Sequence, residues 1–153
     1  MARTGIPGAA RALRAAALAT AALAAAGTAL AGAVPEPTRL LQEGRDVPLD
    51  EWRAMTAGRT VWYRVDGEFW GRERYDREGD GVTFQFRDGE CFDGSWRRTE
   101  DRWYCFDFGF ARPHCFRHLE LDGEFWALGV EGGVQKIERI DDAPLACGPD
   151  VVS

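Results

Sequence analysis

Between residues 59 and 140 the chain alternates hydrophobic and polar positions over short runs, a pattern typical of β-strands with one buried face. In one run, Val82, Phe84 and Phe86 alternate with polar neighbours. The runs that show this pattern are residues 59–65, 68–75, 82–87, 95–100, 102–108, 114–121, 124–130 and 134–140. The pattern therefore predicts an all-β chain of about eight strands.

Pairs of Asp-Gly or Gly-Gly separate most of these runs, and they are strong hairpin signals because glycine accepts the positive φ of a type I′ turn. The pairs begin at Asp66, Asp80, Asp88, Asp93, Asp122 and Gly132. Because short loops join antiparallel neighbours, we expect an antiparallel meander. A meander of this size closes into a small lipocalin-like barrel or bends into a strongly curved sheet.

One short N-terminal helix is predicted over residues 48–58, before the first strand. Asp50 is expected to cap its N-terminus, and Gly58 to supply the left-handed position after its last turn. Trp52 and Met55 lie on one face of this helix, so we expect them to plug or cover the sheet.

The first 33 residues have the features of a secretory signal peptide. Arg3, Arg11 and Arg14 precede an apolar run over residues 15–26, and A-x-A cleavage patterns end at residues 31 and 33. A membrane anchor is the alternative, but the run is shorter than the roughly 20 residues that span a bilayer. We expect export to the periplasm or the extracellular space, with no stable membrane span after cleavage.

The remaining chain is predicted to hold a single disulfide-stabilised β-domain over residues 48–147. Residues 34–47 show no clear period and are expected to form an extended N-terminal segment, and residues 148–153 a C-terminal tail. The chain of 153 residues carries a net charge of −6, which falls to −9 when the three arginines of the signal peptide are removed. This acidity argues against nucleic acid as a partner.

Four cysteines in an exported chain of this size predict two disulfides, with three possible pairings. Cys105 and Cys115 are symmetric about residue 110, so a hairpin centred there sets them opposite each other. Cys91 would then pair with Cys147. In the same register Tyr104 lies opposite Phe116 on the other face, which places the Cys105–Cys115 bridge on the outer, less apolar surface.

The spacing of the histidines argues against a metal site. Cys115 and His118 have a ligand-like C-x-x-H spacing, but residues three apart on a strand point to opposite faces. His114 and His118 share a face and stand about 13 Å apart along it. We therefore expect neither a metal nor a cofactor.

No pattern singles out a catalytic residue. A nucleophilic G-x-S-x-G motif is absent, and the many acids include no distinctive pair for glycosidase chemistry. The domain is therefore expected not to be an enzyme. Glu73 is a possible polar site residue because it lies within an aromatic strand; the alternative is an ion pair with an arginine of a neighbouring strand.

Aromatic residues are the remaining functional lead, with six Trp, nine Phe and three Tyr. They can form the core and cross-strand pairs, or they can line a binding surface. The possible binding aromatics on predicted strands are Trp62, Trp70, Trp96, Trp103 and Trp126.

The order of several short motifs resembles a family of small exported bacterial proteins of unknown function. The motifs are Gly58-Arg59-Thr60, Gly71-Arg72-Glu73-Arg74-Tyr75, Cys91-Phe92-Asp93-Gly94-Ser95-Trp96, Cys105-Phe106, Cys115-Phe116 and Cys147-Gly148-Pro149. Phe116 stands where a tryptophan often follows the third cysteine of that family. The resemblance implies export and a disulfide-stabilised β-domain, and it transfers no catalytic residue.

Two functions are consistent with these patterns. The first is non-catalytic binding of a small apolar or aromatic ligand in the barrel, which requires a concave cavity. The second is interaction with an envelope protein, for example as an inhibitor of a hydrolase or protease. That function requires a filled core and an exposed anchor, such as a protruding loop or residues 34–47.

Overall fold

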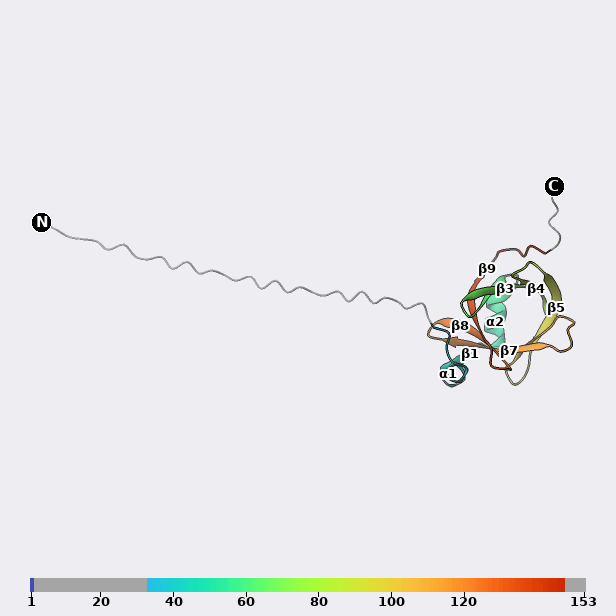
Figure 1. The fold of residues 1–153 in the computed structure, drawn as a ribbon, viewed down its shortest axis with the longest axis horizontal. Coiled ribbons are helices and arrows are strands. Elements are labelled where there is room, and N and C mark those ends of the chain that lie inside the picture. Colours follow the sequence, from blue (N-terminus) through green and yellow to red (C-terminus); the bar gives the residue numbers. More distant parts are fainter. Residues whose placement is uncertain (2–32, 148–153) are drawn as a thin grey trace. The chain divides into compact units, whose positions relative to one another are not determined.

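Eight antiparallel strands close into a barrel in the computed structural model of the protein, which describes Met1 and residues 33–147 (Figure 1). Apart from Met1 and Ala33, the predicted signal peptide lies outside the described residues, as does the predicted C-terminal tail. The barrel strands are β2 (Thr60–Val65), β3 (Glu68–Tyr75), β4 (Gly81–Phe86), β5 (Cys91–Arg98), β6 (Tyr104–Asp107), β7 (His114–Leu121), β8 (Glu124–Gly129) and β9 (Val134–Asp141). Each strand pairs with the next one in sequence, and β9 pairs with β2 to complete the ring. The predicted meander and its closure are confirmed.

Two of the predicted Asp-Gly turns form tight hairpins with positive φ at both residues. Asp66 and Gly67 have φ of 50° and 80°, and Asp122 and Gly123 have φ of 55° and 77°. These values fit type I′ turns, whose twist matches that of the flanking strands. The turn expected at Asp93-Gly94 is wrong, because both residues lie inside β5, which begins at Cys91 rather than at residue 95.

The segment before the barrel is more ordered than its sequence suggests. Residues 34–47 were expected to be extended, but they contain the helix α1 (Pro37–Glu43) and the two-residue strand β1 (Arg45–Asp46), which pairs with β7. Proline at the first helical position helps to start α1. The helix buries Leu40 against Leu119 and Trp126 on the outer face of β7 and β8, and this one contact anchors a helix too short to show a period.

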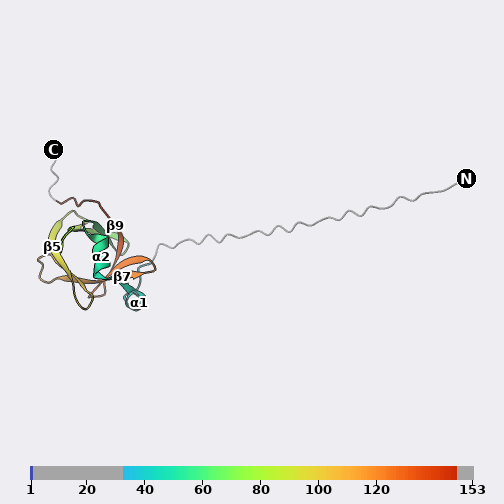
Figure 2. The same cartoon turned by 180° about the vertical axis from the view of Figure 1, so that it is seen from behind.

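The second helix, α2 (Leu49–Thr56), plugs the barrel, as predicted. Figures 1 and 2 show it within the ring of strands from both sides. Trp52 is fully buried, and its ring centroid lies 5.9 Å from that of Tyr75 and 4.1 Å from that of His118. Asp50 is not the N-cap: Pro48 occupies that position, and Asp50 lies in the first turn, where its charge favours the helix dipole.

Both disulfides have the predicted pairing. Cys105 and Cys115 are direct partners on β6 and β7, and Cys91 is joined to Cys147. Tyr104 faces Phe116 as expected, so the Cys105–Cys115 bridge is on the outer face of the hairpin. Cys105 is nevertheless only 6% exposed, so that face is more covered than expected. Two disulfides indicate an oxidising, extracytoplasmic location.

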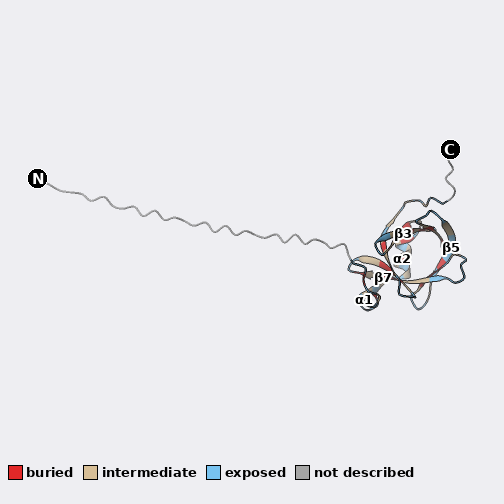
Figure 3. Cartoon of the chain, viewed as in Figure 1, coloured by how far each residue is buried: buried red, intermediate tan, exposed pale blue. Residues whose placement is uncertain are grey.

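Buried positions alternate along the second half of β3, whereas β6 and β8 each bury three consecutive residues (Figure 3). Inward-facing side chains form one main core with Trp52, and a smaller cluster lies outside the barrel beneath α1. Within the described part of the chain, no helix is both long and apolar enough to span a membrane.

Candidate ligand-binding cavity

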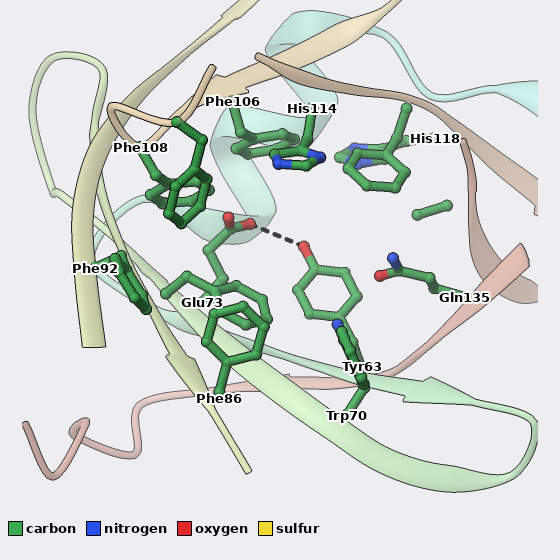
Figure 4. Close-up of a pocket in the computed structure, with 14 residues that line it drawn as sticks. Tyr63, Trp70, Glu73, Phe86, Phe92, Phe106, Phe108, His114, His118 and Gln135 are labelled. Carbon is green, nitrogen blue, oxygen red and sulfur yellow. Dashed lines mark hydrogen bonds between the residues drawn. The ribbon is translucent and has the colours of Figure 1, made fainter. Parts of the chain in front are cut away.

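An aromatic cavity of about 170 Å³ occupies the part of the barrel interior that α2 does not fill (Figure 4). Its aromatic wall consists of Tyr63, Trp70, Phe84, Phe86, Phe92, Phe106, Phe108, Phe110 and Phe116. Its polar side chains are Glu73, His114, His118 and Gln135, and Ala127 completes the lining. The cavity is therefore mostly apolar with a few convergent polar groups, the usual composition of a small-molecule site.

Edge-to-face contacts hold the phenyl rings of this wall together. The ring centroids of Phe84 and Phe86 are 4.8 Å apart, and those of Phe86 and Phe92 are 5.7 Å apart, both in T-shaped geometry. The ring centroid of Phe92 also lies 5.1 Å from that of Phe110. Such pairs stabilise by about 0.5–1.5 kcal/mol each beyond their buried area. The wall is therefore a mutually supported surface before any ligand arrives.

Two glycines make room for this wall. A Cβ atom on Gly71 would lie 2.5 Å from Cζ of Phe84, and one on Gly94 would lie 2.6 Å from Cδ1 of Phe108. Gly94 therefore serves inside β5 as a close-packing position rather than as a turn residue. Glycine within a strand often marks such a close approach.

Glu73 is the buried acid of the cavity. It lies on the inner face of β3 and is 3% exposed. The hydroxyl of Tyr63 donates a hydrogen bond of 2.9 Å to Oε2 of Glu73 (Figure 4). The hydroxyl of Tyr75 donates one of 2.6 Å to the same oxygen. Burial raises the pKa of Glu73 to about 7, although the two hydrogen bonds act to lower it. Burial also raises the pKa values of Tyr63 and Tyr75 well above their usual range, so both stay protonated donors.

The ion pair with a neighbouring arginine, considered for Glu73 above, is not found among the described residues. Arg72 and Arg74 flank it in sequence but lie on the outer face of β3 by alternation. Arg72 donates to Gln85, and Arg74 donates to Thr60. The acid is therefore satisfied by hydroxyl groups rather than by a positive charge.

Both histidines face the cavity, on the inner face of β7. His118 is 1% exposed and stacks on Tyr104, with ring centroids 4.3 Å apart and planes 10° apart. Burial lowers the pKa of His118 to about 3, so its imidazole is neutral. His114 lies nearer the solvent, beside Phe110. No group of three or more His, Cys, Asp or Glu within residues 33–147 is arranged to hold a metal ion.

The mouth of the cavity carries exposed aromatic rings. Trp70 is 40% exposed, and it has no partner on β2 because a bulge shifts the register from Tyr63–Gly71 to Arg64–Phe69. Bulges commonly re-aim a side chain next to a functional site. Phe110, in the loop between β6 and β7, is 42% exposed.

A shallow groove of about 490 Å³ continues from this mouth, past Trp70 and His114, toward the turn between β8 and β9. Val130 in that turn is 66% exposed. The mouth thus opens onto an apolar rim.

Of the five tryptophans considered as binding aromatics, only Trp70 lines the cavity. Trp96 is buried in the main core, and Trp126 belongs to the cluster outside the barrel. Trp62 lies on the outer face, with the Arg139 guanidinium 3.7 Å from its ring centroid. Trp103 is half-buried and is not part of the lining.

The phenylalanines of the wall are candidate site residues that the sequence interpretation missed. Their signal was present: Phe84 and Phe86 share a face in one strand, and Phe106, Phe108 and Phe116 share the face of a hairpin. The alternation places these rings inside the barrel, but it does not determine whether the interior is filled or hollow.

Searches of protein-family models, of curated proteins and of solved structures found no match to this chain.

Proposed function

We propose that this domain is an exported, non-catalytic binding protein that holds a small apolar or aromatic molecule inside its barrel. The observation that carries the proposal is the aromatic cavity of about 170 Å³. Eight-stranded barrels have room for side chains or for one small ligand, and here α2 and its neighbours fill only part of the interior.

The size of the cavity suggests the size of the ligand. An engineered cavity of about 150 Å³ lined by apolar side chains binds benzene. A cavity of about 170 Å³ is therefore matched to a compound with a single ring or a few atoms more. The exposed rings of Trp70 and Phe110 at the mouth provide an apolar surface on which such a compound can first land.

Export is part of this proposal. The N-terminal residues have the composition of a signal peptide, and disulfides are typical of proteins in an oxidising compartment. The protein would then bind its ligand in the periplasm or outside the cell. A relation to lipocalins in the strict sense is not part of the proposal, which needs only the closed barrel and its cavity.

A binding titration with a cavity-filling variant tests the proposal. Single-ring compounds, both neutral and charged, are titrated while tryptophan fluorescence is followed, because Trp70 lines the cavity. The Ala127→Leu substitution adds three carbons at a lining position that is 1% exposed. The matched control is Ala54→Leu on the exposed face of α2.

We expect saturable binding to the native protein, at least about tenfold weaker binding to A127L, and no change in A54L. Thermal melting and circular dichroism of both variants check that they are folded. The proposal fails if no compound of the panel binds, or if A127L binds as well as the native protein.

The exposed rim favours a second candidate function, contact with an envelope protein such as a hydrolase or protease that the domain would inhibit. Phe110 and Val130 are exposed anchors at the mouth. The N-terminal segment is fixed to the barrel by Leu40 and Val47, which are fully buried, and it exposes Leu41. Inhibition assays against a panel of proteases test this candidate. Inhibition by the native protein that is lost in F110S would favour it, and no inhibition at all would count against it.

A further inference from the structure

The carboxylate of Glu73 has one oxygen that the protein does not use. Both tyrosine hydroxyls donate to Oε2, and among the described residues no donor reaches Oε1. Figure 4 shows this carboxylate within the cavity, surrounded by phenyl rings. Oε1 is therefore an acceptor open to a ligand.

No positive charge of the described chain compensates this acid. The arginines nearest in sequence, Arg72 and Arg74, lie on the outer face, where they hydrogen-bond other residues. None of the salt bridges within residues 33–147 includes Glu73. A buried carboxylate without a cation is costly, and a ligand that brings a cation removes that cost.

The wall around Glu73 suits the same kind of ligand. The faces of aromatic rings carry negative electrostatic potential and attract organic cations, most strongly where water is excluded. A purely apolar ligand would gain nothing from the acid. A cation gains from both the acid and the rings.

We infer that the cavity binds a small organic cation, an amine joined to a single ring or a few apolar carbons, with Glu73 as its counter-ion. This inference rests on the proposed binding function and specifies the class of ligand. The ammonium group would lie at Oε1 of Glu73, and the apolar part of the ligand would contact the phenyl rings toward Phe92 and Phe110.

The inference implies a pH dependence with a defined sign. Tyr63 and Tyr75 face Glu73, and both stay protonated. Across the cavity lie His118, which is neutral, and His114, which is nearer the solvent. The pKa of Glu73 is raised to about 7, so the acid is increasingly ionised above that pH. Binding of a cation should strengthen as the pH rises through about 7, while binding of a neutral isostere should not.

Benzylamine and benzyl alcohol form a matched pair of probes, because they have the same ring and the same number of heavy atoms but differ in charge. Isothermal titration calorimetry at about pH 8 would compare them on the native protein, on E73Q and on E78Q, a matched control at an exposed glutamate outside the cavity lining. Benzylamine stays protonated at this pH, as ordinary alkyl amines do. A series with the native protein from about pH 5.5 to about pH 8 is independent of how well E73Q folds.

We expect the native protein and E78Q to bind benzylamine at least about tenfold tighter than benzyl alcohol, and E73Q to lose this preference. In the native protein the preference should also decline below about pH 7. The inference is overturned if benzyl alcohol binds as tightly as benzylamine and pH has no effect, and the proposed function then survives. If neither probe binds the native protein, the inference and the proposed function both fail.

Discussion

The two ends of the barrel are built from similar aromatic residues but are stabilised in different ways. At the closed end, the fully buried ring of Trp52 from α2 packs among Tyr75, Tyr104 and His118. At the open end, rings such as those of Phe86 and Phe92 contact each other but surround a cavity. The difference shows that an aromatic inner face becomes a core only where another element fills it.

The open end has covalent support in place of a helix. Cys91 precedes Phe92, and Cys105 and Cys115 precede Phe106 and Phe116 respectively. The rings that follow these cysteines all line the cavity. The aromatic wall does not pack against a core, and disulfides on its outer face hold it in position instead. A hollow site held in this way is pre-organised for a ligand.

The largest difference between the two ends should come from removing the plug. Trp52→Ala deletes a fully buried ring and should lower the free energy of unfolding by about 3–5 kcal/mol. Phe110→Ala at the open end removes a ring that is 42% exposed and contacts Phe92, and we expect a smaller loss of about 1–2 kcal/mol. Urea unfolding of both variants measures the contrast, and equal losses would contradict the distinction between a filled and a hollow end.

Removing the disulfides should weaken the open end. The closure between Cys91 and Cys147 spans 56 residues and that between Cys105 and Cys115 spans 10. Loop-closure entropy assigns them about 4 and about 3 kcal/mol. Guanidinium unfolding of the double variants C91S/C147S and C105S/C115S measures these losses. A smaller loss for the longer loop would show that native contacts of the tail, such as Gln85 with Ala146, replace the cross-link.

Much of the barrel could be predicted from the sequence because its strands are joined locally. Alternation gave the strand faces, Asp-Gly pairs gave hairpins such as that at Asp66, and symmetry about residue 110 gave the register of Cys105 with Cys115. These features depend on neighbours in sequence. The helix α1 was missed because Leu40 alone anchors it, through contacts with β7 and β8 that no local period reveals.

The site was less predictable for a physical reason. Large tryptophans are candidates both for a binding surface and for a core. In this protein Trp96 is buried in the main core and Trp126 in the cluster outside the barrel. Whether an inward face is hollow depends on the volumes of all facing side chains together, and on how far α2 enters the barrel. The setting of Glu73 is recognisable from its inward position within an aromatic strand. Its partner Tyr75 lies two residues further along the same strand, but its partner Tyr63 comes from the pairing of β2 with β3.

The acid at the open end should also give stability an unusual pH dependence. The folded pKa of Glu73 is raised to about 7 from 4.5, so between these pH values the folded state holds a proton that the unfolded state has lost. Stability from this group is therefore present below about pH 4.5 and is lost as the pH rises through about 7. The loss is on the order of 3 kcal/mol, from about 1.4 kcal/mol per pKa unit.

His118 acts with the opposite sign over a lower range. Its folded pKa is about 3, so its contribution grows as the pH rises from about 3 to 6.5. Both the native protein and E73Q contain His118, so its contribution cancels in the difference between their free energies of unfolding. That difference therefore reports the contribution of Glu73 alone. We expect that difference to decline from about pH 4.5 to about pH 7. A difference that is flat with pH would show that Glu73 is not buried as a neutral acid.

The smallest expected effect concerns the fit of the open wall. On Gly94 an added Cβ would meet Phe108 Cδ1 at 2.6 Å and the carbonyl oxygen of Asp107 at 2.4 Å, so Gly94→Ala must displace the ring or the strand. Overpacking of this kind costs about 1–3 kcal/mol. Gly133→Ala is the matched control, because a Cβ there has no neighbour within 4 Å and its φ is not positive. Thermal and urea unfolding of G94A and G133A measure the two losses, and equal stability would mean that the open wall yields easily and is not the rigid, pre-organised surface argued above.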